Sequence, residues 1–243
     1  MLVFNFHHVE AHADKAGRPW LTISPEGLAR FIKTFRMLGF TFVSLKSALD
    51  TPEAFWADHD RKVVITFDDG YVNNYEYAWP VLEKMACPAT FFVLPGAFGG
   101  TNEWDFPNLP ESERDALMTL EHMQAMAKSP WVTFGSHGLK HRHLAQIPPD
   151  LLQQELHESY QILATHLGEA FLPIMAYPWG KYSSEVLVAM SNTPYKLGLT
   201  TNKGVWHPAS DVFQVPRYTG FLRDGYPLIL LIKLMRNGLW PKL

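Results

Sequence analysis

Two adjacent carboxylates end an apolar run in the stretch VVITFDDG at residues 63–70. Asp68 and Asp69 therefore stand side by side at the mouth of an expected buried strand. Like charges held this close resist joint ionisation. A metal ion resolves the conflict, because it neutralises one carboxylate and leaves the other free to act as a base. The pair therefore indicates a cation site, although D-D-G is also common turn chemistry.

Two histidines supply the further ligands that such a site needs. His137 and His141 lie in the stretch SHGLKHRHL at residues 136–144, and a single turn can bring both imidazoles onto one centre. Two imidazoles and one aspartate leave coordination positions open for water and substrate, which is typical of a catalytic rather than a structural metal site. A three-ligand metal with a bound water is in turn typical of hydrolases.

The elements that must position these residues are short strands alternating with helices. Strands are expected at residues 2–6, 40–45, 63–67, 89–94, 131–136, 173–178, 196–201 and 213–218, and helices at residues 24–39, 77–85, 112–128, 149–166 and 183–191. Repeated βα units predict parallel strands with the helices outside. The carboxyl ends of such strands converge, so residues 68–69, 137–141 and 177–180 are expected on one face.

The composition is that of one well-cored globular domain. Of 243 residues, 47% are hydrophobic and 14% are aromatic, and we expect a single domain over residues 1–243. The formal charge of −3 gives no basic field for nucleic acid. One cysteine, Cys87, excludes an intrachain disulfide framework. The N-terminus MLVFNFHHVE has no signal-peptide pattern, so we expect the protein in the cytoplasm, at most peripheral to the inner membrane. Removal of a leader is the alternative.

Three stretches of the chain together resemble one known family. TFDDG at 66–70 is similar to the family's first motif, SHGLKHRHL at 136–144 to its second, and ACPATFFVLPG at 86–96 to the segment between them. The family is the polysaccharide deacetylases with the NodB homology domain, carbohydrate esterase family 4. The resemblance runs from Phe4 to about Gly220. It implies an α/β fold, the family's distorted (β/α) barrel with fewer than eight regular strands.

The resemblance also implies chemical roles. Asp69, His137 and His141 are expected to hold a divalent metal, and Asp68 to act as the general base. Zinc is the expected ion, and cobalt or nickel could use the same ligands. The implied reaction is metal-dependent hydrolysis of an N-acetyl group on an amino sugar, in a polysaccharide or in its biosynthetic precursor. The missing signal-peptide pattern favours the precursor.

The third motif departs from the family pattern R-x-P-Y/F. AYPWG at 176–180 has Ala176 where the arginine would stand. Relatives of the poly-N-acetylglucosamine deacetylase type share this pattern and have an arginine later in the chain, directly after a proline. VPRY at 215–218 matches that arrangement. The resemblance thus implies Arg217 as the residue that orients Asp68, and the backbone N–H of Trp179 as part of the oxyanion site. A plain structural ion pair is the alternative for Arg217.

The expected general acid departs from the family pattern as well. No histidine follows His207, so the usual C-terminal L-x-H is absent. In the same relatives the acid comes from an N-terminal Y-H-x-V strand, which FHHV at 6–9 resembles, and this implies His7 as the acid. His8 then faces the opposite side, because neighbouring strand residues alternate. A core histidine is the alternative for His7. Gly138 replaces the usual Ser or Thr, which is expected to alter metal affinity.

A glycan is the expected partner, because a pyranose offers an apolar face to aromatic rings. The aromatic candidates for such stacking are Tyr71, Trp104, Trp179 and Trp206. Two other functions stay open. Ala176 and the missing L-x-H motivate a relative that has lost catalysis and binds glycan or organises a biosynthetic complex. An O-acetyl esterase would use the same site on acetate esters.

The C-terminal stretch GYPLILLIKLMRNGLWPKL predicts an apolar helix at about residues 226–238. Its interspersed Lys233, Arg236 and Lys242 are typical of an interfacial helix that contacts a membrane surface. A last helix that closes the barrel, or an oligomer contact, is the preferred interpretation. No run reaches the ~18–20 apolar residues of a membrane span. The sequence leaves the oligomeric state open.

Overall fold

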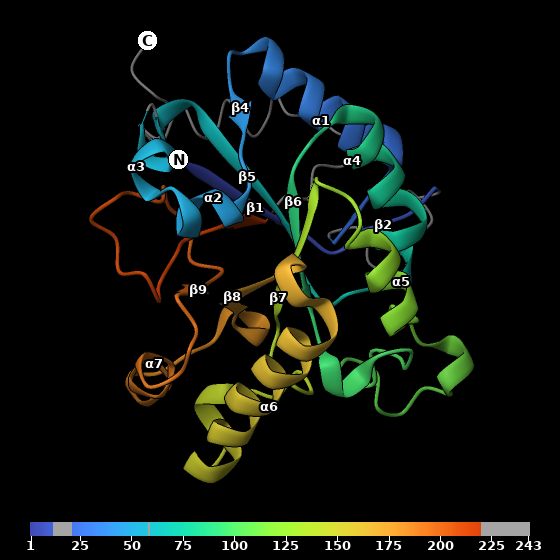
Figure 1. Cartoon of the computed structure of the whole chain (residues 1–243). Coiled ribbons are helices and arrows are strands. Elements are labelled where there is room, and N and C mark those ends of the chain that lie inside the picture. Colours follow the sequence, from blue (N-terminus) through green and yellow to red (C-terminus); the bar gives the residue numbers. More distant parts are fainter. Residues whose placement is uncertain (12–20, 58, 220–243) are drawn as a thin grey trace.

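The computed structural model describes residues 1–11, 21–57 and 59–219, and its centre is a parallel sheet (Figure 1). The strands of this sheet are β1 (Leu2–Phe6), β4 (Thr41–Phe42), β5 (Lys62–Phe67), β6 (Ala89–Val93), β7 (Val132–Ser136), β8 (Phe171–Ala176), β9 (Leu197–Leu199) and β10 (Tyr218–Thr219). Their order is β10-β1-β5-β6-β7-β8-β9, with β4 also beside β5. Every strand pairing in it is parallel, as the βα alternation predicts.

The sheet closes irregularly between its two edges. The segment that precedes β10 returns alongside β9, where Val215 N donates to Gly198 O at 2.8 Å and Thr200 N donates to Val215 O at 2.9 Å. The same segment then enters β10, which pairs with β1 at the far end of the strand order. Of the described strands, five have five or six residues and the others have two or three. The fold is therefore the expected distorted barrel with fewer than eight regular strands.

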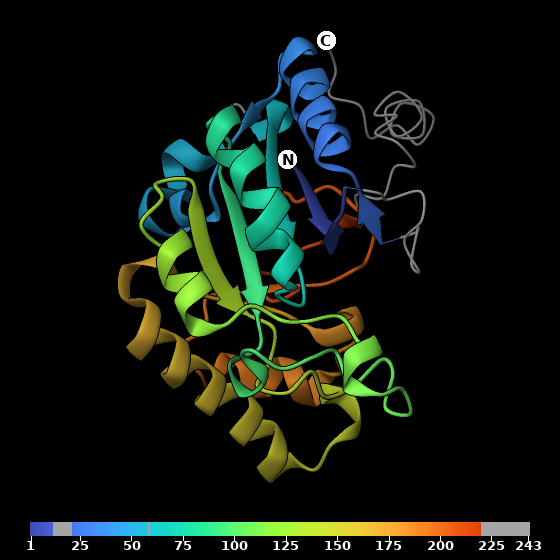
Figure 2. The same cartoon turned by 90° about the vertical axis from the view of Figure 1, so that its right-hand side faces the viewer.

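Most helices pack on the outer face of the sheet, whereas two short ones at residues 45–50 and 52–56 contribute Leu45 and Phe55 to the apolar cluster on the opposite face (Figures 1 and 2). The helices are α1 (Pro25–Met37), α2 (Leu45–Asp50), α3 (Pro52–Trp56), α4 (Trp79–Met85), α5 (Leu120–Met126), α6 (Pro149–Leu167) and α7 (Ser184–Ser191). A π-helical turn at Asn74–Ala78 leads into α4. A separate pair of short parallel strands, β2 (His8–Val9) and β3 (Thr22–Ile23), lies outside the main sheet. As expected, Ser24 caps α1, because its side chain accepts a hydrogen bond from Gly27 N at 3.0 Å.

Alternate strand residues point into two apolar clusters. The cluster between sheet and helices includes Phe4, Phe91, Phe134, Phe31 of α1 and Leu156 of α6. The opposite cluster, inside the curl of the sheet, includes Val3, Val64, Phe92, Ile174 and Leu199. Asn5, Thr66 and Asp68 continue the inward series of β1 and β5, because residues two apart in a strand face the same side. The polar residues of the site thus lie at the end of an apolar interior.

Four expected elements are much shorter than predicted, and one of them is the strand expected at 196–201, which is only β9. The strand expected at 40–45 ends at Phe42, because Ser44 caps α2 by accepting a hydrogen bond from Lys46 N at 3.1 Å. The strand expected at 213–218 is reduced to β10, because the chain turns where Gln214 N donates to Asp211 O at 3.0 Å. The helix expected at 112–128 begins only at Leu120, because Thr119 caps it.

None of the helices that the structure describes is long and apolar enough to cross a membrane. The apolar helix expected at about 226–238 lies outside the described residues, and so do Lys233, Arg236 and Lys242.

Candidate active site

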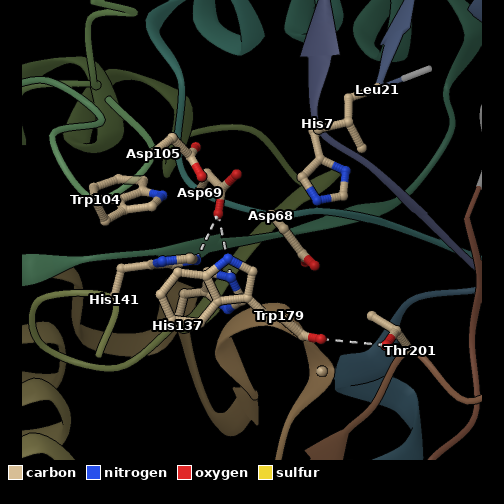
Figure 3. A pocket seen from close by; sticks show the side chains of 11 residues that line it. His7, Leu21, Asp68, Asp69, Trp104, Asp105, His137, His141, Trp179 and Thr201 are labelled. Atoms are coloured by element: carbon tan, nitrogen blue, oxygen red, sulfur yellow. Dashed lines mark hydrogen bonds and ion pairs between the residues drawn. The ribbon is translucent and has the colours of Figure 1, made fainter. Parts of the chain in front are cut away.

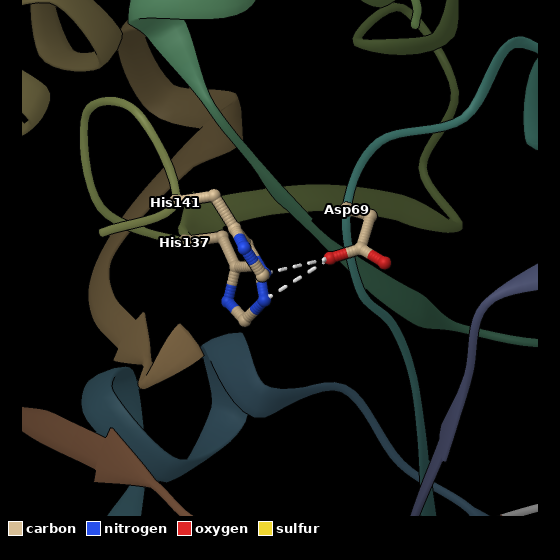
Figure 4. A group of neighbouring side chains, drawn as sticks. All are labelled: Asp69, His137 and His141. Carbon is tan, nitrogen blue, oxygen red and sulfur yellow. Dashed lines mark ion pairs between the residues drawn. The ribbon is translucent and has the colours of Figure 1, made fainter. Parts of the chain in front are cut away.

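Three of the sequence-predicted residues meet at one point. The Oδ1 atom of Asp69 lies 3.3 Å from Nε2 of His137 and 3.3 Å from Nε2 of His141 (Figure 4). One potential ligand atom from each residue falls within 4.8 Å of the others, and all three side chains are buried. Asp69 follows β5, whereas both histidines lie on the loop that follows β7. The convergence of strand ends thus brings the expected ligand set together.

The hydrogen bond of His137 indicates that this cluster fits a cation. Its Nδ1 lies 2.7 Å from the carbonyl oxygen of Ala176, and because a carbonyl can only accept, Nδ1 carries the proton. In the neutral ring Nε2 then presents a lone pair to the Asp69 carboxylate. Two acceptors at 3.3 Å need a proton or a metal ion between them. This orientation of a histidine by a backbone carbonyl is usual for metal ligands.

The pKa shifts of His137 and His141 indicate that a proton and a metal ion would compete for the same ring nitrogens. Burial acts to lower the pKa of His137, but the carboxylates of Asp69 and Asp68 outweigh it and raise that pKa above its usual value. Burial lowers the pKa of His141, which leaves its ring neutral and its Nε2 able to ligate. The residues therefore fit a divalent metal of the zinc, cobalt or nickel type.

The second aspartate is paired with a buried arginine. Arg217, fully buried, binds Asp68 through two parallel contacts, Nη1 to Oδ1 at 2.7 Å and Nη2 to Oδ2 at 2.8 Å. The guanidinium also donates to Thr200 O at 2.9 Å and to Thr66 Oγ1 at 3.1 Å. Asn5 Nδ2 lies 3.3 Å from Oδ2 of Asp68. The carboxylate is thus fixed in position and orientation.

The charge of this pair determines the state of Asp68. Burial acts to raise the pKa of Asp68, but the positive charge of Arg217, with smaller effects of His137 and His7, outweighs it and holds that pKa below its usual value. Asp68 is therefore an ionised carboxylate at neutral pH. Sequence reasoning paired Arg217 with Asp68 through the VPRY stretch, and the structure places the two in contact.

One pocket collects the remaining candidates. His7, Asp68, Asp69, His137, His141 and Trp179 all line it (Figure 3). His7 points into this pocket, and its Nδ1 has no hydrogen-bond partner among the described residues. His8 faces the other way and stacks on Tyr71 with 3.8 Å between ring centroids. The alternation along β1 and β2 thus separates the two histidines as expected.

Backbone strain marks the same place. Among the described residues, four other than glycine have positive φ: Asp69, Ala86, His141 and Trp179. Three of these line the pocket. A left-handed conformation costs an L residue roughly 1–2 kcal/mol and persists where surrounding contacts enforce it, which happens most often at functional sites.

The four aromatic candidates for sugar stacking separate into two groups. Trp179 is 43% exposed at the rim of the pocket, and Trp104 lies in its wall with its ring stacked on His141 at 4.5 Å. The predictions for Tyr71 and Trp206 are wrong. Tyr71 is fully buried, and Trp206 is buried against Trp56 with 4.9 Å between ring centroids. Neither ring offers a free face to a ligand.

Several residues that contact the site were missed by sequence reasoning. Asn5 and Thr66 face inward two residues before His7 and Asp68, so the period of a strand could have indicated them. The sequence could also have indicated Glu155, because a carboxylate next to Leu156 and one turn from Leu152 on the apolar face of α6 needs a buried partner. The carbonyl of Ala176 gives no signal in a sequence, because every residue has one.

A parallel distorted barrel with two carboxylates and two histidines at its carboxyl end is the arrangement of a hydrolase site. The family model described as polysaccharide deacetylase matches residues 57–198, which is more than half of the chain. The chain belongs to the polysaccharide deacetylase family, as its motifs predicted.

Two curated relatives extend this finding. YxkH of Bacillus subtilis strain 168 is 32% identical over 145 residues, which cover 60% of this chain and 46% of that protein. The poly-beta-1,6-N-acetyl-D-glucosamine N-deacetylase of Staphylococcus aureus strain MRSA252 is 26% identical over 165 residues, covering 65% of this chain and 53% of that protein. The chain therefore spans about half the length of the curated relatives it matches.

Two solved structures match nearly the whole chain. Streptococcus pyogenes deacetylase PplD, solved in complex with acetate, is 26% identical with a TM-score of 0.75, and the match covers 96% of both chains. IcaB from Ammonifex degensii is 23% identical with a TM-score of 0.76, and the match covers 95% of both chains. The second likeness shows the fold alone.

Proposed function

We propose that this chain is a metal-dependent N-deacetylase that removes the acetyl group from an N-acetylated amino sugar, in a polysaccharide or in its biosynthetic precursor. The observation that carries the proposal is that one pocket holds both a cluster of metal-ligand atoms and a separate ionised carboxylate. Asp69, His137 and His141 form a cluster of acceptors that fits a divalent metal. Beside them Asp68 is held ionised by Arg217. Zinc is the proposed ion, and cobalt or nickel are substitutes.

Asp69, His137 and His141 would hold the metal. When bound, the ion supplies Lewis acidity, which polarises the acetamide carbonyl and lowers the pKa of the attacking water. Asp68 would accept the proton of that water. Because Arg217 lowers the pKa of Asp68, this carboxylate is a weak base that stays ionised across the neutral range, and the two contacts fix the direction of its remaining lone pairs.

His7 would donate a proton to the departing amine. It enters the pocket from the end of β1, whereas the histidine ligands enter from the loop after β7, so it can reach the amide nitrogen from another side (Figure 3). As the C–N bond breaks, the amine takes the proton from His7 and the acetyl group leaves as acetate. The backbone N–H of Trp179, in the turn Pro178–Gly180 at the pocket rim, is proposed to bind the developing oxyanion.

The absence of an arginine at position 176 is not an obstacle to this mechanism. Arg217, 149 residues away in the sequence, supplies a guanidinium to Asp68. This contact favours an active enzyme over a relative that has lost catalysis. Trp179 and Trp104 at the pocket are the proposed contacts for the sugar ring.

The test is acetate release by zinc- or cobalt-loaded protein. The substrates are soluble N-acetylglucosamine oligomers, UDP-linked N-acetyl sugars and an aryl acetate, with Asp68→Asn as the control. Release from an N-acetyl substrate that vanishes in Asp68→Asn supports the proposal, and the preferred substrate separates polymer from precursor. Release from the aryl acetate alone would favour an O-acetyl esterase. No release by protein that binds one metal ion would favour a relative without catalysis.

A further inference from the structure

A buried carboxylate from α6 holds the loop that carries both histidine ligands. Glu155 is 1% exposed, and its Oε2 accepts hydrogen bonds from the backbone N–H of Leu139 at 2.7 Å and of Lys140 at 3.1 Å. These two residues lie between His137 and His141 in the sequence. Oε1 of the same carboxylate lies 3.2 Å from Nε of Arg142. Three donors thus compensate a charge that would otherwise be costly to bury.

The loop is shaped to receive this carboxylate. Gly138 has a φ of +82°, and a Cβ added there would lie 3.1 Å from Oε2 of Glu155. A side chain at this position would therefore crowd the carboxylate against the amides. On its other side the loop is held by Gly96, whose N–H donates to Leu139 O at 2.9 Å. Glu155 and Gly96 together fix the peptide that precedes Lys140.

The two ligand histidines differ in how much they depend on this loop. The ring of His137 is oriented directly, because its Nδ1 donates to Ala176 O at 2.7 Å. The Nδ1 of His141 has no hydrogen-bond partner among the described residues. The ring of His141 is held by packing against Trp104 and Trp179, and its backbone has a φ of +55°. The direction of this ligand therefore depends on the backbone that leads into it.

We propose that Glu155 is a positioning residue of the metal centre, which fixes the backbone of residues 139–140 and thereby aims His141 at the ion. This inference rests on the proposed function only in that Asp69, His137 and His141 bind a metal. A residue that orients a ligand usually changes metal affinity by about 10–100-fold when it is removed.

The test compares zinc affinity among variants of the full chain by competition with a chromophoric chelator. Glu155→Met fills the space without accepting hydrogen bonds and is expected to weaken zinc binding by about 10–100-fold. Glu155→Gln keeps a carbonyl that can accept from both amides and is expected to stay within about threefold of the wild type, because the positioning bonds survive. Arg142→Ala leaves these bonds in place and is expected to bind like the wild type.

Two controls separate positioning from loss of folding. Ser159→Ala removes a buried hydrogen bond to Tyr195 from the same helix, and it should leave zinc affinity unchanged. The visible spectrum of bound Co²⁺ reports ligand geometry, and Glu155→Met should change it whereas Ser159→Ala should not. Wild-type zinc affinity and an unchanged Co²⁺ spectrum in Glu155→Met would overturn the inference, as would a Glu155→Gln variant that binds as weakly as Glu155→Met. Tight zinc binding without acetate release would contradict the proposed function and leave the role of Glu155 intact.

Discussion

Asp68 and Asp69 are neighbours in the chain and both are buried, yet their charges are balanced in different ways. Asp68 faces a permanent cation, because Arg217, which is 149 residues away in the sequence, binds both of its oxygens. Asp69 faces two imidazoles whose state depends on pH and on metal. The protein thus supplies one counter-charge itself, and for the other we propose an exchangeable metal ion.

This difference fits the proposed division of labour. A base must stay ionised and keep one direction through the reaction, and a bidentate arginine enforces both. A metal site must bind and orient an ion while leaving positions open, so it needs acceptors rather than donors. Substitutions that remove one counter-charge at a time test whether the two aspartates differ in this way.

The largest expected effect on stability comes from removing the fixed cation. Arg217→Met leaves Asp68 as an uncompensated buried charge, which is expected to lower the free energy of unfolding by about 3–5 kcal/mol. The double variant Asp68→Asn/Arg217→Met should recover much of this loss. Urea unfolding of the metal-free proteins measures it. The control is Lys46→Met, which breaks an exposed pair with Asp50 and should cost no more than about 1 kcal/mol. If Arg217→Met and Lys46→Met lowered the free energy of unfolding equally, Asp68 would not be a buried charge that Arg217 compensates.

Removing the carboxylate of Asp69 should change stability mainly through the loss of metal binding. Asp69→Asn is expected to abolish the stabilisation that zinc gives the wild type, which is about 2.7 kcal/mol at a free zinc concentration 100 times Kd. At a pH above the raised pKa of His137, where the His137–Asp69 ion pair is lost, the metal-free variant should unfold at nearly the wild-type urea concentration. Thermal or urea unfolding with zinc and with EDTA measures both quantities. A variant that is still stabilised by zinc would show that Asp69 is not a ligand.

The pH dependence of zinc binding should follow His137. At a pH below its raised pKa, His137 of the metal-free protein carries an extra proton on its ring that a metal ion must displace. Stability from the His137–Asp69 ion pair is then present below the ordinary histidine pKa of 6.5 and is lost as pH rises through the raised pKa. Zinc affinity should change in the opposite sense and fall by up to about tenfold per pH unit below that pKa.

Calorimetry in buffers of different ionisation enthalpy checks this linkage. The number of protons released per zinc ion should approach one below the raised pKa of His137 and decrease above it. Zinc binding that releases no proton and does not vary between pH 6 and 8 would contradict a metal that competes for Nε2 of His137.

The smallest expected effect comes from the pocket rim. Trp179→Ala removes the exposed ring, which also packs on His141, but keeps the backbone N–H proposed for the oxyanion. With the metal site saturated, KM should therefore rise several-fold with a smaller change in kcat. Steady-state acetate release from the preferred substrate measures this division. Trp206→Phe, at a buried position outside the pocket, should leave KM unchanged. If turnover by Trp179→Ala instead fell by about two orders of magnitude, the ring itself would have a part in the chemistry.

The sequence predicted the site better than the elements around it. Asp68, Asp69, His137 and His141 follow apolar strands, and the carboxyl ends of parallel strands meet, so their convergence follows from the pattern. Arg217 could be paired with Asp68 only through a family resemblance, because the contact joins residues 149 positions apart in the sequence. The aromatic candidates failed where residue type alone was used. Tyr71 and Trp206 are buried, and burial depends on packing that no local pattern records.

The missed boundaries have a common physical cause. Residues 40–45 have strong β-propensity, but Ser44 caps a helix there and ends the strand. Thr119 likewise delays α5 beyond the expected helix start. In each case one side-chain hydrogen bond overrides the propensity of several residues. Glu155 was missed because its contacts with the histidine loop are tertiary.

The central proposal is that Asp68 acts as the general base and its neighbour Asp69 as a metal ligand. Its most direct test measures zinc content and acetate release together in Asp68→Asn. The account predicts one zinc ion per chain, as in the wild type, and a rate of release lower by about 10²–10⁴-fold. Loss of the zinc ion from this variant, or release at the wild-type rate with zinc bound, would contradict it.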